Sequence, residues 1–526
     1  MKNQPVTSAL SSSFLQSCNP IKAAAIKLCL AMFFLLFAVV ITRAQTIKNF
    51  SKEGKQITRF DNLGNAVDAH DGEIAYFNGT YYLYGTSYDC GFEWNNKKAP
   101  FCGFKTYSSP DMVNWKDEGF LFDAQTPLWQ SRCDGKTYGC FRPHVIYNKK
   151  NSTYVLWINV YDNVSGYRVF TAKTPTGPFT EVAEPKISVN SNMPAAGLNN
   201  GDHDLFIDDD GTGYLAFTDW RTTGTIVVEQ LTEDYLSGTG KVAKNITPGK
   251  TEAPALFKRN GIYYITYSDP NCGYCSGTGT SYRTAKSPLG PWSEGKQINA
   301  NSCGGQPSFV STMKVGTETI YLYGSDLWNN AAKNEALANF YWAPLTFAED
   351  GSINPMECLK SFVLKKSKPT KVNSLKPDSD DEYKASCDID GNLQRTQSFT
   401  APKTGLLKAF AITTLKSGYP TSDLKLAFYE AEGGKIKGKK PLSISAIAQE
   451  SIGWSAKNTV VNPNIKLSKG KQYIVVLHSE TTQGCYGFAS AKAKSGNKEI
   501  SSVSSDRGST FSVEPDQKLK FQLYID

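Results

Sequence analysis

Residues 251–270, TEAPALFKRNGIYYITYSDP, predict two β-strands joined by a tight turn. An apolar run precedes Asn260-Gly261, and the aromatic and β-branched run IYYITY follows it. Asn-Gly between two such runs is typical of a hairpin with a type I′ turn. Pro254 cannot donate to a β-ladder, so it marks the beginning of the first strand. Glu252 is therefore expected just before a buried strand. A carboxylate there costs free energy unless it has a partner or a function. A position in a surface loop is the alternative.

The same pattern recurs five times along the chain, at intervals of roughly 50–70 residues. Each repeat continues with an apolar run, a polar turn, an aromatic-rich run and a third short run. Three or four strands per repeat and no helices predict an all-β fold whose main part is a five-bladed β-propeller. A β-sandwich with similar hairpins is the alternative. The repeats begin at Asp71, Arg142, Asp202, Glu252 and Gln306.

The chain divides into four predicted segments. Residues 1–44 read as a signal peptide, because lysines precede the uncharged run Leu28–Thr42 and Gln45 follows small residues; an uncleaved anchor is the alternative. Residues 45–362 hold the propeller, and residues 363–384, rich in Lys, Ser and Pro, form a linker. Residues 385–526 predict a jelly-roll-like β-sandwich. Its role is either carbohydrate binding, with Trp454 and a few tyrosines as the platform, or stabilisation alone.

Charge and cysteine content add to this picture. The net charge of +8 arises from 57 basic and 49 acidic residues without a basic block, which disfavours nucleic acid as a partner. A secreted, periplasmic or extracellular monomer without a membrane span after signal removal is expected. An oxidising compartment favours disulfides, with Cys90 near Cys102 and Cys133 near Cys140. Cys387 and Cys485 can pair across the sandwich, and Cys272 and Cys275 form a loop disulfide or pair with Cys303.

Residues 60–355 resemble glycoside hydrolase family 43. The resemblance is carried by Ala69-His70-Asp71-Gly72, SPDMVNW after the first hairpin, Asp202 before the DDDG turn, Glu252-Ala253-Pro254 and TAKSPLGPW. Within the family, FRPHVIYNKK, GLNNGDHDLFIDDDG, EAPALFKRNG and GGQPSFV are most similar to the galactan 1,3-β-galactosidase branch. That branch has a Gly-rich segment where this chain has His70-Asp71-Gly72-Glu73, so the acid here implies the general family mechanism.

Hydrolysis of a glycosidic bond by inversion needs a carboxylic acid that protonates the leaving oxygen and a carboxylate that activates water, about 6.5–9.5 Å apart. The resemblance implies Glu252 as the acid, Asp71 as the base and Asp202 as the neighbour that raises the pKa of Glu252. Blades one and four are not adjacent in a five-membered ring, which suits this separation. Asp71 can alternatively cap a turn with Gly72, and Glu73 is then the substitute base.

Further residues are candidates for binding substrate, each with a structural alternative. Arg142 can hold the acids or form a structural ion pair. Glu73, Asp204 and Gln306 can bind substrate hydroxyls, and Gln306 can instead position water. Trp328 can stack on a sugar ring or pack internally. No metal or cofactor is required; a structural calcium ion held by a channel histidine, as in some relatives, is an alternative whose ligands the sequence does not reveal.

These observations predict a secreted, inverting, exo-acting glycoside hydrolase. The expected substrate is an oligo- or polysaccharide, β-galactan or a related plant polysaccharide side chain. The alternatives are an α-L-arabinofuranosidase or β-xylosidase of the same family, and a non-catalytic glycan-binding propeller.

Overall fold

The computed structural model confirms an all-β chain with a five-bladed propeller and a C-terminal β-sandwich. It describes residues 46–92, 99–134, 139–190, 200–269, 277–315, 317–328, 334–364, 382–494, 496 and 498–526. The predicted signal peptide and most of the predicted linker lie outside these residues. The expectation of no helices is wrong in detail, because α2 (Pro127–Arg132) follows blade one, with Thr126 as its N-cap and Pro127 at its first position.

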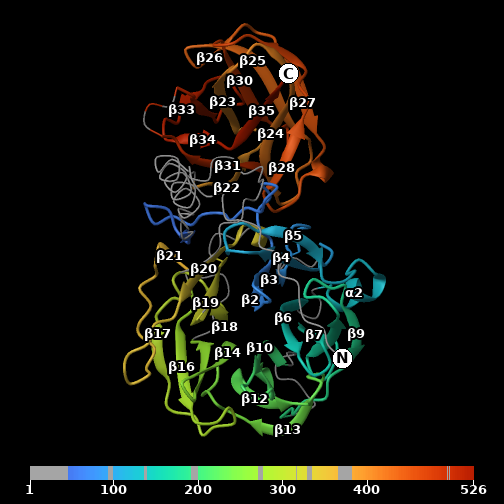
Figure 1. Ribbon diagram of the computed structural model, residues 1–526. Coiled ribbons are helices and arrows are strands. Elements are labelled where there is room, and N and C mark those ends of the chain that lie inside the picture. Colours follow the sequence, from blue (N-terminus) through green and yellow to red (C-terminus); the bar gives the residue numbers. More distant parts are fainter. Residues whose placement is uncertain are drawn as a thin grey trace, which may run out of the picture. The chain divides into compact units, whose positions relative to one another are not determined.

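Each blade is an antiparallel sheet whose strands follow one another in sequence order. The first strands β2, β6, β10, β14 and β18 lie towards the inside of the ring (Figure 1). Blades one to four have four strands and blade five has three: β2 (His70–Phe77), β3 (Thr80–Thr86), β4 (Phe104–Ser109) and β5 (Lys116–Phe120); β6 (Cys140–Asn148), β7 (Thr153–Val160), β8 (Tyr167–Ala172) and β9 (Thr180–Ala183); β10 (Asn200–Ile207), β11 (Gly213–Asp219), β12 (Thr225–Leu231) and β13 (Gly238–Ala243); β14 (Glu252–Arg259), β15 (Ile262–Ser268), β16 (Thr280–Ala285) and β17 (Lys296–Asn299); β18 (Gln306–Val315), β19 (Glu318–Leu327) and β20 (Asn339–Pro344).

The hairpin turns have the conformation that their sequence predicts. Asn260 and Gly261 both have positive φ, +51° and +74°, as a type I′ turn requires. Pro254 does not begin its strand, because β14 already starts at Glu252. The proline instead lies in a register irregularity between Glu252 and Ala255, where no ladder hydrogen bond is needed from it.

A hydrophobic cluster separates each pair of neighbouring blades, and the second strands supply both sides. Leu156 belongs to the cluster shared with blade one, whereas the next residue, Trp157, belongs to the cluster shared with blade three. Successive strand residues point to opposite faces of a sheet, and here both faces are buried. This double burial explains why runs such as IYYITY are apolar throughout instead of alternating.

The ring closes where its two ends meet. The strand β2 lies against β18 as well as β6, so the five first strands form a continuous inner circle. The short strands β1 (Thr46–Lys48) and β21 (Ser361–Val363) pair antiparallel. Ile47 and Phe362 from this pair enter the cluster between blades five and one. The propeller is therefore joined at its ends by backbone pairing and by shared apolar packing.

The C-terminal region consists of two seven-stranded sheets around one apolar cluster that includes Phe410, Leu426 and Val475. One sheet contains β22 (Lys384–Ile389), β24 (Gly405–Ser417), β28 (Lys457–Val461), β29 (Ile465–Leu467), β31 (Cys485–Lys492), β34 (Gln517–Leu519) and β35 (Phe521–Ile525). The other contains β23 (Gln394–Thr400), β25 (Leu424–Glu432), β26 (Lys435–Lys437), β27 (Ser443–Ile447), β30 (Gln472–His478), β32 (Ser501–Ser504) and β33 (Ser512–Val513).

Four disulfides link described residues. The expected pairs Cys90–Cys102, Cys133–Cys140 and Cys387–Cys485 are confirmed. Pairing of Cys303 with Cys272 or Cys275 is wrong, because Cys303 is bonded to Cys358. Cys272 and Cys275 lie outside the described residues.

Within the described part of the chain, no helix has the length and apolar character needed to cross a membrane.

Candidate active site

The first strands of the blades are irregular near the end where the predicted site residues lie. In an irregularity of this kind one strand carries extra residues, which redirects side chains out of the regular alternation. The register shifts lie between His70 and Glu73, Phe141 and His144, Asn200 and His203, Glu252 and Ala255, and Pro307 and Phe309.

Three residues in these irregularities have left-handed backbone conformations. The φ angles of Asp71, Arg142 and Ala253 are +57°, +58° and +52°. Such angles are uncommon for residues with a Cβ and cost free energy, so the surrounding structure must hold them in place. Their recurrence at the same end of blades one, two and four indicates that this end is specialised.

Asp71 is buried and accepts three hydrogen bonds. The hydroxyl of Thr86 and the main-chain N–H of Arg142 donate to Oδ1, at 2.8 and 3.2 Å, and the hydroxyl of Tyr88 donates to Oδ2 at 3.0 Å. Burial raises the pKa of Asp71 to about 7, with the Asp326 carboxylate adding to the rise while Arg142 opposes it. This carboxyl is therefore ionised only above roughly neutral pH.

Arg142 links blade two to blades three and five. Its guanidinium donates from Nη2 to Asp202 Oδ2 at 3.0 Å, and from Nη1 to the carbonyl oxygens of Pro307 and Ser308 at 3.1 and 3.4 Å. The Arg142 side chain is buried, whereas the Asp202 side chain keeps 17% of its exposure. Arg142 thus holds Asp202 while leaving that carboxylate in contact with solvent.

Glu252 is buried beside this ion pair. Gln306 Nε2 donates to Glu252 Oε1 at 2.5 Å, which fixes the orientation of the carboxyl group. Burial, and then the nearby Asp202 carboxylate, raise the pKa of Glu252 to about 8, against the opposing effects of Arg142 and Gln306. A carboxylic acid that stays protonated at neutral pH can donate a proton to a leaving group.

Hydrogen bonds, ion pairs and charge interactions thus connect Asp71, Arg142, Asp202, Glu252 and Gln306, which come from five different blades. One carboxyl group is set to be protonated near neutral pH, another can be ionised, and a third is paired with arginine. This arrangement can support general acid–base chemistry.

Glu73 and Asp204 lie two residues further along their strands, next to His144. Glu73 Oε1 accepts from the Val145 N–H at 2.5 Å, and Asp204 Oδ2 accepts from the Leu256 N–H at 2.6 Å. Burial raises the pKa of Asp204 to about 7 and that of Glu73 well above its usual range. Each acid thus ties its blade to the next, a structural role beside the predicted binding role.

The same three side chains could hold a metal ion, because their ligand atoms lie within 4.8 Å of one another. His144 Nδ1 is 3.3 Å from Asp204 Oδ1 and 3.8 Å from Glu73 Oε2. Burial, with the Arg142 charge adding to it, lowers the pKa of His144 to about 3, so its imidazole is neutral and able to ligate. Ca²⁺ prefers more oxygen ligands than two carboxylates supply. Two carboxylates with one imidazole resemble the ligand sets of Zn²⁺ more closely.

The Trp328 side chain is buried and is not exposed for ligand binding. It is 8% exposed and belongs to the cluster between blades one and two. The ring lies 5.7 Å from the His70 ring and 5.8 Å from the Tyr88 ring. This placement favours the packing alternative over stacking on a sugar.

Sequence reasoning missed Asp326, which lies directly behind Asp71. Asp326 Oδ2 accepts from the Asp71 N–H at 3.1 Å and from the Ser308 hydroxyl. Asp326 Oδ1 lies 3.7 Å from His70 Nδ1. The sequence does carry a sign of this role, because Asp326 is an acid within the otherwise apolar run IYLYGSDLW. A carboxylate buried in such a run needs a polar or charged partner.

Comparison with known proteins agrees with this geometry. The sequence model of the glycosyl hydrolases family 43 matches residues 60–344, which contain all five blades. The chain belongs to glycosyl hydrolase family 43. The resemblance stated from the sequence is thereby confirmed.

Two curated relatives are similar in sequence to part of this chain. A β-D-galactofuranosidase of Aspergillus niger is 31% identical over 232 residues, 42% of this chain and 62% of the relative. An arabinoxylan arabinofuranohydrolase of Bacillus subtilis is 28% identical over 264 residues, 44% of this chain and 51% of the relative. The chain thus spans little more than half the length of these relatives.

Among solved structures, an exo-β-1,3-galactanase from Clostridium thermocellum is 20% identical, with a TM-score of 0.51, over 91% of this chain and 100% of the other. At this identity the likeness concerns the fold.

Proposed function

We propose that this family 43 chain is an inverting glycoside hydrolase that removes a terminal sugar from a glycan. Glu252 protonates the leaving oxygen, and Asp71 removes a proton from the water that attacks the anomeric carbon. Asp202 keeps Glu252 protonated through its negative charge. The observation that carries the proposal is the burial of Glu252 beside Asp202, which raises the pKa of Glu252 to about 8.

The three hydrogen bonds to Asp71 support its role as base. Donors bind both oxygens of the Asp71 carboxylate and so fix its orientation. These hydroxyl and amide groups keep their protons at neutral pH, so they do not act as acids towards the substrate. Arg142 stabilises the negative charge on both Asp71 and Asp202. Gln306, which holds the Glu252 carboxyl, can also reach a substrate hydroxyl from the blade-five strand.

The substrate proposed first is a glycan ending in a β-linked galactose. The relative with 31% identity is a β-D-galactofuranosidase, which favours the furanose ring form. The segments that resemble the galactan 1,3-β-galactosidase branch favour β-1,3-galactan instead. A terminal α-L-arabinofuranoside is the second candidate, because a relative from Bacteroides ovatus that is 27% identical is a non-reducing end α-L-arabinofuranosidase.

A panel of four chromogenic glycosides tests these alternatives: β-D-galactofuranoside, β-D-galactopyranoside, α-L-arabinofuranoside and β-D-xylopyranoside. We expect preference for the first, and proton NMR of the earliest product should show the anomer opposite to that of the substrate. Hydrolysis of none of the four, and of no galactan or arabinan, would refute the enzyme assignment. A first product with retained configuration would refute Asp71 as a base.

Secretion is proposed from the N-terminal sequence and from the four disulfides, which form and persist in oxidising compartments. Mass spectrometry of the protein recovered outside the cytoplasm should give an N-terminus at Gln45. Recovery of the intact N-terminus in a membrane fraction would favour the anchor.

A further inference from the structure

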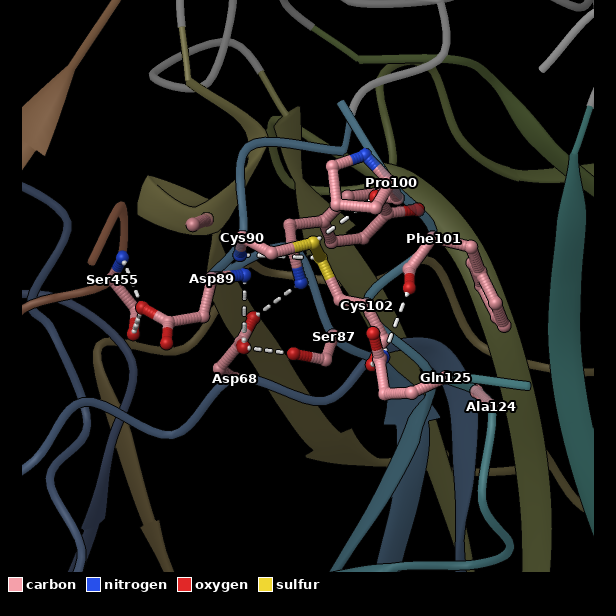
Figure 2. Close-up of a disulfide and its surroundings, with 12 residues drawn as sticks. Asp68, Ser87, Asp89, Cys90, Pro100, Phe101, Cys102, Ala124, Gln125 and Ser455 are labelled. Atoms are coloured by element: carbon pink, nitrogen blue, oxygen red, sulfur yellow. Dashed lines mark hydrogen bonds between the residues drawn. A yellow bond between two sulfur atoms is a disulfide. The ribbon is translucent and has the colours of Figure 1, made fainter. Parts of the chain in front are cut away.

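A short segment of the sandwich is bound to the loop that follows strand β3 of the propeller. Asp89 Oδ1 accepts from the N–H and the hydroxyl of Ser455, at 2.9 and 2.6 Å (Figure 2). Asp89 Oδ2 pairs with Lys457. The Trp454 N–H donates to the Asp89 carbonyl at 3.0 Å. The contact thus uses both the side chain and the backbone of Asp89.

The two surfaces approach too closely to tolerate extra atoms. A Cβ on Gly453 would lie 2.2 Å from Asp89 Oδ1, and a Cβ on Gly91 would lie 2.7 Å from the Trp454 ring. Lys416 Nζ lies 4.5 Å from the centre of the same ring, and Trp454 packs against the cluster between blades one and two. Trp454 is therefore engaged in this contact and is not an open platform for carbohydrate.

The loop is also held from the propeller side. Asp68 accepts hydrogen bonds from the Ser87 hydroxyl at 2.6 Å and from the main-chain N–H groups of Tyr88 and Asp89 at 2.9 and 3.2 Å. The disulfide Cys90–Cys102 begins at the next residue (Figure 2). Asp68, the disulfide and the sandwich segment therefore fix the backbone from residue 87 to residue 90.

This loop carries a group that reaches the candidate base. The Tyr88 hydroxyl donates to Asp71 Oδ2 at 3.0 Å, and the Tyr88 ring is buried. His70 lies between Asp68, 3.6 Å from its Nε2, and Asp326, 3.7 Å from its Nδ1, and Asp326 accepts from the Asp71 N–H. Tyr88, which belongs to the segment that Asp68 organises, and Asp326 thus each form a hydrogen bond with Asp71.

We propose that the C-terminal sandwich is a positioning element of the active site: by binding Asp89 it holds Tyr88 against Asp71 and so orients the base. Asp89, Ser455 and Lys457 are positioning residues, since they act through Tyr88 and touch no substrate. This inference rests on the proposed function of Asp71 and adds a role for the sandwich that is neither glycan binding nor stabilisation alone.

The test compares pH profiles of kcat/KM for full-length variants. A hydrogen bond to the ionised form lowers the pKa of a carboxyl, so its loss should move the acidic limb of the profile upward. We expect a shift of about 0.5–1 pH unit in Tyr88→Phe and a shift in the same direction in Asp89→Ala and in Ser455→Ala/Lys457→Ala. Asp89→Asn, which keeps an oxygen for Ser455, should shift the limb less.

Lys408→Ala is the matched control on the sandwich, because Lys408 is 58% exposed and pairs with Asp526. It should leave the limb unchanged. An unshifted limb in Asp89→Ala and in Ser455→Ala/Lys457→Ala, with a shift in Tyr88→Phe, would overturn the role of the sandwich. An unshifted limb in Tyr88→Phe would overturn the role of Tyr88.

Hydrogen exchange of the Tyr88 and Asp89 amides gives a readout that needs no substrate. Because both amides donate to Asp68, we expect exchange at least about tenfold faster in Ser455→Ala/Lys457→Ala, and no change in Lys408→Ala. A wild type inactive on every glycoside would refute the proposed function, whereas unchanged exchange would refute the docking inference even in an active enzyme.

Discussion

Charged side chains are buried at the mouth of the propeller ring, whereas apolar side chains fill the space between the sheets of the sandwich. Asp71, Glu73, Arg142, Asp204 and Glu252 are each less than 9% exposed. In the described part of the sandwich, the buried charged residues are two lysines whose ammonium groups lie over aromatic rings, Lys416 over Trp454 and Lys520 over Phe60.

This contrast separates two uses of a protein interior. Burying a carboxyl raises its pKa and costs stability, which a domain tolerates where the raised pKa serves chemistry. Burying phenylalanine and leucine stabilises the fold directly. We therefore expect substitutions in the ring centre to change activity more than stability, and substitutions in the sandwich core to do the reverse.

Glu252→Gln should produce the largest effect. General acid catalysis contributes about 10²–10⁴-fold, so kcat/KM on a glycoside with a poor leaving group should fall by that factor. The unfolding temperature should not fall, because the variant replaces a buried acid by a neutral isostere. Steady-state kinetics and calorimetry measure both quantities.

Glu233→Gln is the control for this variant, since Glu233 is exposed and pairs with Lys150 on the surface. Its kcat/KM should match that of the wild type. If Glu252→Gln lost less than about threefold in kcat/KM, Glu252 would not be the acid.

Phe410→Ala tests the expectation that substitutions in the sandwich core change stability more than activity. Phe410 is fully buried and packs against Phe428 and Phe521, so its truncation should lower the free energy of unfolding by about 3–5 kcal/mol. Denaturant titration measures this loss, and kcat/KM of the folded variant at 25 °C should stay near the wild-type value.

The exposed pair Lys408–Asp526 provides the reference, because Lys408→Ala should cost less than about 1 kcal/mol. Equal losses of stability in Phe410→Ala and Lys408→Ala would contradict a core at Phe410.

The sequence predicted the elements that local chemistry determines. Five blades could be predicted from the Asn-Gly turns, the aromatic runs and the acid or other polar residue at the start of each repeat. The same pattern predicted that Asp71, Asp202 and Glu252 lie close together. Asp326 and Tyr88 were missed because their importance comes from contacts made across blades and loops. The burial of Trp328 and the packing of the half-buried Trp454 also depend on distant partners, so these tryptophans could not be assigned to packing or to ligand binding from sequence.

Asp204→Asn should have a smaller, pH-dependent effect on stability. The folded-state pKa of Asp204, about 7, lies above its ordinary value, so the wild type loses stability as the pH rises from about 4 to 7. The asparagine variant does not lose this stability, because its side chain does not ionise. Its melting temperature relative to wild type should therefore be higher at pH 8 than at pH 5, in a buffer series followed by calorimetry.

Asp516→Asn, at an exposed site in the sandwich, should show no such trend. A difference between Asp204→Asn and wild type that is the same at both pH values would show that Asp204 has no raised pKa in the folded protein.

The pH dependence of kcat/KM on an aryl glycoside with a poor phenol leaving group, whose departure depends on protonation, tests the central claim most directly. Activity should require ionised Asp71 and protonated Glu252, which places the acidic limb near pH 7 and the alkaline limb near pH 8. Glu252→Gln should keep the acidic limb and lose the alkaline one. An alkaline limb that persists unchanged in Glu252→Gln would contradict the account.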